Sequence, residues 1–229
     1  MEHIAEELME QLETADAFSF TVSGYTINIA ESVVVSWIVI GIVLVLCLVL
    51  TTGLKVDHIS RRQALAEWLV EKGEGLIESM VGEEGKEYIP YLLTVLIFIG
   101  LSNTIGLIGM KPPTKDLNVT AALAIMSIVI VQIAAIRQKR VGGWLKGFTH
   151  PVAIVTPINI LELGIKPLSL CMRLFGNVVG AFVIMELLKT VVPVLLPAVF
   201  SLYFDIFDGL LQAYVFVFLT SMYIKEAIE

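Results

Sequence analysis

Charged side chains are scarce in this sequence of 229 residues. Only 16% of the residues are Asp, Glu, Lys or Arg, whereas 57% are hydrophobic. A soluble domain averages about 25% charged and about 45–50% apolar residues. Both departures, together with a mean hydropathy of +0.86, predict a protein that lies within a membrane rather than in water.

Cysteines and metal-binding patterns are also sparse. The two cysteines, Cys47 and Cys171, lie far apart in apolar stretches, so two packed thiols are a simpler interpretation than a disulfide framework or a metal site. The three histidines are not spaced as ligands, and no HExxH, CxxC or GxSxG motif is present. The sequence therefore predicts no metal, no cofactor and no enzyme site of the chain's own.

Basic residues are missing from the first 31 positions, where acids are frequent. A secretory signal needs a basic start and a transit peptide needs arginine, so neither is expected. No basic footprint for nucleic acid is present, and no nucleic-acid partner is expected. Residues 1–32 are predicted to form an acidic segment outside the cytoplasm, and the lack of a transit peptide favours a bacterial plasma membrane over an organelle.

Long apolar runs occupy most of residues 33–229, which we interpret as a single transmembrane domain. A bilayer core about 30 Å thick requires about 20 apolar residues per helical crossing. Spans are predicted at about 33–54, 89–108, 119–136, 153–189 and 194–224. Pro193 and Pro197 indicate a hairpin turn between the last two spans, because each proline removes a backbone donor. The predicted fold is an all-α polytopic membrane protein with five passes.

Two of the predicted helices do not fit an upright crossing. A straight helix over residues 153–189 would extend about 55 Å at 1.5 Å per residue, so the hairpin helices are expected to be strongly inclined or broken. At about 60–81, Ser60 and Gln63 fit a capping box, and an apolar stripe lies opposite a row of glutamates. This amphipathic pattern predicts a helix in the interface plane, with membrane anchoring as its simplest role.

Positive charge predicts the orientation of the spans. Basic clusters follow the first and the third span: Lys55, Arg61, Arg62, Arg137, Lys139, Arg140 and Lys146. Alternating passes put both clusters on one side, which the positive-inside rule assigns to the cytoplasm. The N-terminus is then expected outside and the C-terminus in the cytoplasm.

Several ionisable side chains fall within the predicted hairpin: Glu162, Lys166, Arg173, Glu186, Asp205 and Asp208. Such residues are costly in hydrocarbon and usually mark an ion or substrate path. Arg173 lies far from either end of its span and keeps its proton at any accessible pH. It is interpreted as a fixed charge that meets a mobile carboxylate; the alternative is an internal salt bridge.

Helical spacing gives each arm of the hairpin a polar face. Steps of three and four residues join Glu162, Lys166, Ser169, Arg173 and Asn177 on the first arm, and Asp205, Asp208 and Gln212 on the second, with Tyr223 eleven further on. A simple pair between Glu162 and Lys166 is the alternative on the first arm. A turn centred near Val194 would bring Arg173 close to Gln212.

The same register would bring Glu186 close to Asp205, near the outer tip of the hairpin. Acids in that position, Asp208 among them, could line a wet inlet for ions. Solvation of these acids at the membrane interface, without any transport role, is the alternative interpretation. The predicted inlet therefore requires the two arms of the hairpin to lie close together.

The segment Arg173-Leu-Phe-Gly-Asn177 resembles the signature of subunit a of F-type ATP synthases. Further segments are similar to that family in the same order: Ser102–Ile108, Pro113–Ala124, Pro157–Glu162, Lys166-Pro167 and Gln212–Phe216. The resemblance covers the chain from the first span to the C-terminus. It implies a membrane subunit that is not catalytic alone and that lies beside a rotating ring of c subunits.

The resemblance also implies a mechanism and partners. Two offset aqueous half-channels would pass H⁺ or Na⁺ to and from the ring carboxylates, and rotation would drive ATP synthesis in a soluble ATPase sector. Peripheral-stalk b subunits and membrane lipid complete the expected surroundings. Arg173 would face the ring carboxylate, with Gln212 and Asn177 as polar partners. The half-channel residues would be Glu186, Asp205, Asp208, Ser169, Glu162 and Tyr223.

Two positions depart from the family pattern. Many members carry Glu where this chain has Phe182, and many place His or an acid at the position of Asp205. Glu186 and Asp205 are therefore the predicted inlet acids, although Glu186 lies about 140° from Arg173 on a helical wheel. A stand-alone channel or secondary transporter is the competing function, but no internal repeat is evident. A pure scaffold would leave Arg173 without a purpose.

Overall fold

The computed structural model describes residues 16–22, 25–54, 60–147, 156–191 and 200–228. Its longer elements are β1 (Asp16–Val22), β2 (Tyr25–Ala30), α2 (Glu31–Thr51), α3 (Arg61–Val81), α4 (Ile89–Thr104), α5 (Leu117–Gly147), α6 (Thr156–Val191) and α8 (Gly209–Ile228). Short 3₁₀ turns are η1 (Glu83–Tyr88), η2 (Ile105–Ile108) and η3 (Pro113–Lys115), and η5 (Leu202–Asp208) is a π-helix.

Five helical stretches among the described residues are long and apolar enough to cross a membrane. They cover Glu31–Thr51, Glu83–Ile108, Leu117–Leu145, Thr156–Lys189 and Leu202–Ile228. The prediction of an all-α polytopic membrane protein is therefore confirmed. The predicted hairpin turn near Val194 lies outside the described residues.

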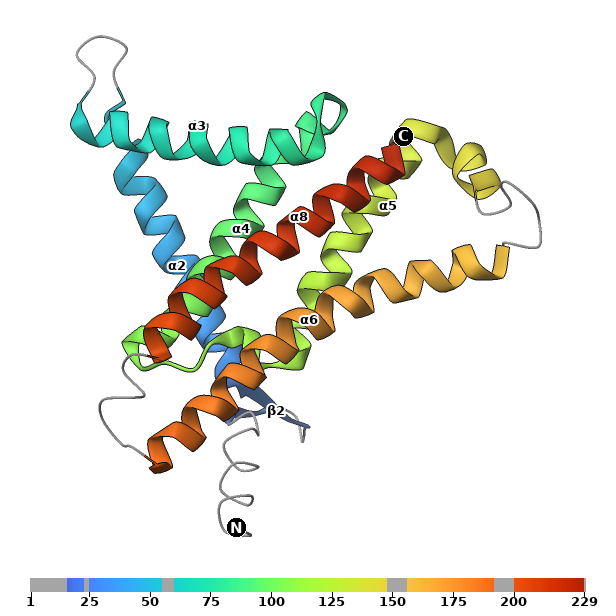
Figure 1. Cartoon of the computed structure of the whole chain (residues 1–229). Coiled ribbons are helices and arrows are strands. Elements are labelled where there is room, and N and C mark those ends of the chain that lie inside the picture. Colours follow the sequence, from blue (N-terminus) through green and yellow to red (C-terminus); the bar gives the residue numbers. More distant parts are fainter. Residues whose placement is uncertain (1–15, 23–24, 55–59, 148–155, 192–199, 229) are drawn as a thin grey trace.

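The helices pack at steep angles to one another rather than as an upright bundle. In Figure 1, α3 runs across the ends of α2 and α4, and both α6 and α8 are inclined. α8 packs mainly against α4 and α5, while α6 packs mainly against α5. The core between them is apolar and fully buried, and its largest members include Leu92, Ile99, Leu170, Leu174, Phe216 and Ile224.

Local chemistry explains where several helices begin. The Ser60 side chain accepts a hydrogen bond from the backbone N–H of Gln63 at 3.2 Å, and α3 starts at the next residue. The buried Asp116 accepts from the backbone N–H of Asn118 at 2.9 Å at the start of α5, and from the Ser32 hydroxyl of α2 at 2.5 Å. One carboxylate thus caps α5 and ties α2 to it.

Some boundaries differ from the hydropathy pattern. α5 continues to Gly147, past the predicted limit at residue 136, and bends at Arg140, whose φ is 57°. Hydropathy marks the membrane limit, whereas basic residues beyond it remain good helix formers, so the helix outlasts the apolar run. α6 stays helical across Pro167 over its whole length, so the expectation of a broken helix is wrong for Thr156–Val191.

The N-terminal segment contains a β-hairpin that the charge pattern does not predict. β1 and β2 pair antiparallel, with Phe18 opposite Ile29 and Val22 opposite Tyr25, and with an irregularity between Asp16 and Phe18. Apolar and polar residues alternate from Phe18 to Val22 and from Tyr25 to Ile29, which is the period-two signal of a strand. That alternation was the available indication of a hairpin leading into α2.

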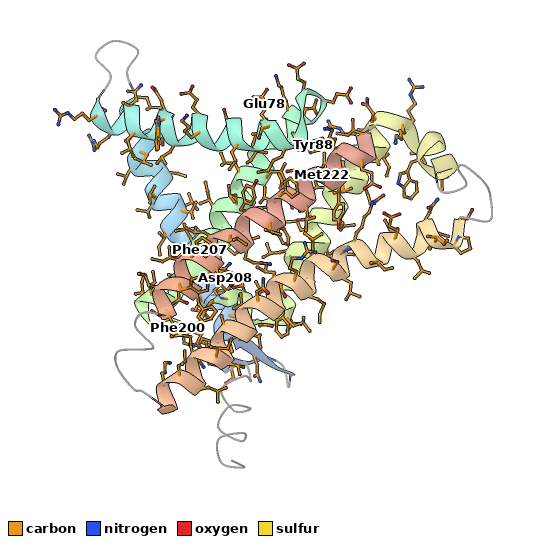
Figure 2. All side chains as sticks on the ribbon, in the orientation of Figure 1. Glu78, Tyr88, Phe200, Phe207, Asp208 and Met222 are labelled. Atoms are coloured by element: carbon orange, nitrogen blue, oxygen red, sulfur yellow. The ribbon has the colours of Figure 1, made fainter. Side chains whose placement is uncertain are left out.

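α2 is the most isolated of the five apolar helices, since only 11% of the residues in its most apolar stretch are buried. Its side chains project into open space along most of its length in Figure 2. The exposed ones are almost all apolar and include Trp37, Leu44, Val45, Leu48 and Val49. Such a surface is suited to lipid or to another hydrophobic chain.

Candidate ion pathway

Arg173 lies in the middle of α6 with its side chain exposed. Its neighbours Leu170, Cys171 and Leu174 are buried in the core, whereas Arg173 lies on the face of α6 that also carries Lys166 and Asn177. No hydrogen bond or ion pair connects Arg173 to another residue in the described part of the chain. The internal salt bridge considered as an alternative therefore has no partner among these residues.

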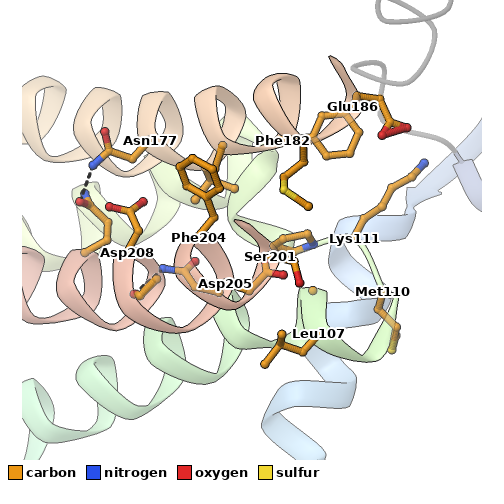
Figure 3. A pocket seen from close by; sticks show the side chains of 18 of the residues that line it. Leu107, Met110, Lys111, Asn177, Phe182, Glu186, Ser201, Phe204, Asp205 and Asp208 are labelled. Atoms are coloured by element: carbon orange, nitrogen blue, oxygen red, sulfur yellow. Dashed lines mark hydrogen bonds between the residues drawn. The ribbon is translucent and has the colours of Figure 1, made fainter. Parts of the chain in front are cut away.

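One turn beyond Arg173, a hydrogen bond joins the two inclined helices. Asn177 of α6 donates its Nδ2 to Oε1 of Gln212 on α8 at 2.6 Å (Figure 3). Gln212 is only 2% exposed, and its Nε2 has no hydrogen-bond partner within the described residues. The contact agrees with the hairpin register predicted from the sequence, which places Arg173 within about a turn of Gln212.

A cavity of about 530 Å³, here named the η5 cavity, extends from this hydrogen bond toward one end of the helices. Its polar lining residues are Asn103, Lys111, Asn177, Glu186, Lys189, Ser201, Asp205, Asp208 and Gln212. Figure 3 shows Asn177 and Asp208 at one end, Glu186 and Lys111 at the other, and Asp205 between them. The three acids predicted to share an inlet thus line one hollow at successive depths.

The acids of the η5 cavity have distinct surroundings. Glu186 forms an ion pair with Lys189 at 2.8 Å, and Lys111 pairs with Glu31 at 3.5 Å. Asp205 lies directly against Gly106 of η2, where an added Cβ would come within 2.9 Å of the carboxylate Oδ1. Glycine at this position therefore makes room for the carboxylate in the cavity wall.

The secondary structure around Asp205 differs from the prediction. The steps of three and four predict Asp205, Asp208 and Gln212 on one face of an α-helix, but both acids lie in the η5 π-helix. A π-helix forms i→i+5 hydrogen bonds and holds more residues per turn than an α-helix. Residue spacing alone cannot distinguish the two, and the three side chains nevertheless line the same cavity.

A second cavity of about 350 Å³, the Lys166 cavity, lies near the other end of α6. Lys166 Nζ is 3.0 Å from Glu162 and 2.9 Å from Glu226, and 5.0 Å from the centre of the Tyr223 ring. All four residues line the hollow, together with Gln132 and Trp144 of α5, among others. The simple Glu162–Lys166 pair exists, but it belongs to a larger polar cluster.

Glu226 was not singled out from the sequence. It follows Tyr223 by three residues on α8, so the two share a helical face, and this spacing was the available signal. Ser169, which was predicted to belong to the pathway, lies on α6 but is not among the residues lining either cavity.

Arg173 separates the two cavities along α6. The Lys166 cavity reaches residue 166 of this helix, whereas the η5 cavity begins at Asn177, and the two share no lining residue. At 1.5 Å per residue, Lys166 and Glu186 lie about 10 Å and about 20 Å along the axis from Arg173. The arrangement is therefore two offset polar hollows with a permanent cation between them.

Lys115, like Glu226, was not singled out from the sequence, and it lies near the η5 cavity. Its Nζ lies 3.5 Å from the centre of the Phe182 ring, and Phe182 lines the cavity. Burial is the main cause that lowers the pKa of Lys115 to about 8; nearby Lys111 lowers it further, while Glu186 and Glu31 oppose the shift. A lysine with a lowered pKa thus lies over Phe182, the position where the resemblance expects a glutamate.

Comparison with known proteins gives consistent matches. The sequence model of the family described as "ATP synthase A chain" matches residues 33–225. The chain is 38% identical to ATP synthase subunit a of Moorella thermoacetica over 205 residues, which cover 89% of this chain and 93% of that protein. It is 36% identical to ATP synthase subunit a 1 of Chlorobium luteolum over 171 residues, 74% and 76% of the two chains.

A third relative has an ion named in its description. "ATP synthase subunit a, sodium ion specific" of Propionigenium modestum is 34% identical over 184 residues, which cover 73% of this chain and 64% of that protein. The family match includes Arg173 and the whole η5 cavity, whereas the β1–β2 hairpin lies outside it.

Proposed function

The chain belongs to the ATP synthase A chain family, and from this membership we propose that it forms two offset half-channels that pass H⁺ or Na⁺ to and from a rotating c ring. As a family member it is a multi-pass membrane component of an ATP synthase and takes part in ion transport. The observation that carries the proposal is the exposed Arg173 between two separate polar cavities.

The charge of Arg173 suits a carboxylate that arrives without its ion. At about 4 Å and an effective dielectric of about 20, a guanidinium and a carboxylate attract by about 4 kcal/mol. This attraction lowers the affinity of the carboxylate for its ion and so promotes release. It is comparable to the driving force of about 2.3 kcal/mol per charge per 100 mV, so hydration and Gln212 would need to moderate it for the ring to keep turning.

The η5 cavity would be the half-channel on the outer side. An ion would pass Glu186 near the mouth, then Asp205 and Asp208, and reach Asn177 and Gln212 at the inner end. Predicted orientation supports this direction, because the basic residues after α2 and in the last turns of α5 favour the cytoplasm on the opposite side. A bacterial plasma membrane, with the N-terminus outside, is the location we propose.

The Lys166 cavity would be the half-channel on the cytoplasmic side. Its acids Glu162 and Glu226 hold the Lys166 ammonium, which lies over the Tyr223 ring. Lys139 also lines the cavity, so its acidic and basic side chains are equal in number. Ser169 would extend the polar face of α6 from this hollow toward Arg173. A stand-alone channel would need a continuous path, whereas the two cavities have no lining residue in common.

Partners follow from the exposed faces. Exposed apolar residues of α6 near Arg173 include Leu168 and Met172, and this part of the helix would contact the c ring. The chain would reach the soluble ATPase sector, which carries the catalysis, through the ring and the peripheral-stalk b subunits. Lipid or a stalk helix would cover the exposed side chains of α2.

Disulfide crosslinking to the ring tests this proposal. Met172, which precedes Arg173, is 51% exposed, and Val45 of α2 is 61% exposed. In the assembled complex, Met172→Cys should crosslink readily to a cysteine placed one turn from the ring carboxylate. Val45→Cys is the matched control and should not. Equal crosslinking at both positions, or crosslinking at Val45 alone, would show that α6 does not face the ring.

The titration of Lys115 predicts a pH effect at the outer side. Below about pH 8 Lys115 is a cation beside the η5 cavity and opposes the approach of another cation; above that pH it becomes neutral. We expect Lys115→Gln to make ATP synthesis faster than in the parent protein at low outer pH, and equal to it at high outer pH. Synthesis should be driven by a potassium diffusion potential, with the variant-to-parent ratio of rates compared at each pH.

Lys115→Arg is the matched control for this effect, because arginine stays charged to about pH 12 and above. Its rate relative to the parent should fall as the outer pH rises through about 8. If the variant-to-parent ratio of synthesis rates does not change with pH for either variant, Lys115 does not influence ion uptake through the η5 cavity.

A further inference from the structure

Asn103 is a buried amide in the wall of the η5 cavity, only 4% exposed. Its Nδ2 donates to the backbone carbonyl of Gly209 at 3.0 Å. Its Oδ1 accepts from the hydroxyl of Thr114, which is fully buried, at 2.6 Å. Both ends of the amide are therefore satisfied, and the Thr114 hydroxyl determines which end points at Gly209.

Gly209 is the residue at which the π-helix η5 ends and the α-helix α8 begins. A Cβ added at Gly209 would come within 2.9 Å of the Asn103 Cβ, so the close approach of α4 to this junction requires glycine. One turn along the same wall, Gly106 makes room for Asp205. The wall formed by α4 and η2 thus approaches η5 closely at two glycine positions, Gly209 and Gly106.

The π-helix decides which side chains face the cavity. A π turn contains about one residue more than the corresponding α-helical stretch, so it rotates the preceding residues by about 100° relative to the following helix. With η5 in place, Ser201 and Asp205 line the cavity with Gln212. In a continuous α-helix anchored at Gly209, Leu202 would take the angular position that Ser201 now has.

We propose that Asn103, oriented by Thr114, is a positioning residue that holds the η5 π-helix and thereby sets which residues before Asp208, Ser201 rather than Leu202 among them, line the cavity. The structural role of Asn103 does not depend on the proposed function, whereas the role of Asp205 and Asp208 in ion uptake rests on it. π-helices are rare and need local support, and the hydrogen bond from Asn103 to Gly209 supplies it at the junction. Thr114 connects this support to η3, the turn that also carries Lys115.

Thiol labelling in the assembled complex tests the proposal. Single reporters Ser201→Cys and Leu202→Cys would be made with Cys47 replaced by alanine, since Cys47 is exposed and Cys171 is buried. A membrane-impermeant thiol reagent added from the outer side should label Ser201→Cys quickly, because Ser201 lines the η5 cavity. It should label Leu202→Cys slowly, because the exposed Leu202 lies outside the cavity on a face expected to contact lipid. These labelling rates report the register of η5 without depending on turnover.

Thr114→Val removes the hydroxyl at nearly the same volume, and Thr114→Ser keeps it. In Thr114→Val, labelling of Ser201→Cys should slow and labelling of Leu202→Cys should rise, each by about threefold to tenfold, as expected for one buried hydrogen bond. Thr114→Ser should restore the original rates. Asn103→Leu should give the same exchange more strongly if the complex still assembles.

Unchanged rates at both reporters in an assembled Thr114→Val complex would overturn the proposal. Slower labelling at both reporters would also overturn it, because closure of the cavity is different from rotation of η5. Failure of the proposed function would be seen elsewhere, as a lack of ring crosslinking at Met172→Cys.

Discussion

Arg173→Ala is expected to abolish ion-driven ATP synthesis and to let ions leak through the membrane sector. Without the guanidinium, a ring carboxylate facing α6 loses about 4 kcal/mol of attraction, which corresponds to about a thousandfold change in its equilibrium with a bound ion. The carboxylate would then retain its ion across the gap between the two cavities. Ions could pass from one half-channel to the other without a full rotation.

Inverted vesicles would measure both effects, as ATP synthesis after an imposed gradient and as passive ion flux with the soluble sector removed. Arg137→Ala is the matched control, since Arg137 forms an exposed pair with Glu87 at 3.0 Å on α5 and η1. Exposed pairs contribute little, so this variant should synthesise ATP normally. Full coupled synthesis without leak in Arg173→Ala would contradict the role given to this residue.

Asp205→Asn is expected to slow ion-driven synthesis by about tenfold or more, because a carboxylate about 7 Å from a passing cation contributes about 2–3 kcal/mol at an effective dielectric of about 20. Asp205 occupies the middle of the η5 cavity, where every ion would pass it (Figure 3). Rates should be measured at several driving potentials, because a slow uptake step is relieved as the potential rises.

Glu186→Gln should have a smaller effect in the same assay. Glu186 is already paired with Lys189 at 2.8 Å, so the variant removes a neutralised carboxylate and leaves a free ammonium at the mouth. Glu83→Gln, on the far side of the molecule and almost fully exposed, is the control and should match the parent protein. Unchanged synthesis in both Asp205→Asn and Glu186→Gln would show that ions do not enter through the η5 cavity.

The parts of the molecule that the sequence predicts well depend on composition and on strong local periodicity. Apolar runs long enough to cross a bilayer predict the polytopic α-helical fold. A hairpin turn centred near Val194 predicts Arg173 within about a turn of Gln212, and Asn177, one turn after Arg173, forms a hydrogen bond with Gln212. A permanent cation far from any helix end points to Arg173 directly, because few structural roles can accommodate it.

The parts that the sequence does not predict depend on contacts between segments. Lys115 approaches Phe182 from a turn more than sixty residues earlier, and nothing in either segment indicates the partner. Asn103 is an ordinary polar residue in an apolar run until Gly209 is placed against it. The π-helix is also not visible in the spacing of apolar and polar residues, because the same spacing fits an α-helix and a helix with one extra residue in a turn.

Pro167 gives the Lys166 cavity an unpaired backbone acceptor on α6. Proline has no N–H, so the carbonyl of Leu163 one turn earlier lacks its usual donor, although α6 stays helical there. Leu163 is also one of the residues lining the Lys166 cavity, where water can solvate that carbonyl. The proline that would weaken a helix in pure hydrocarbon therefore costs little here, and it supplies the Lys166 cavity with a backbone acceptor that is kept when the side chains lining the cavity are substituted.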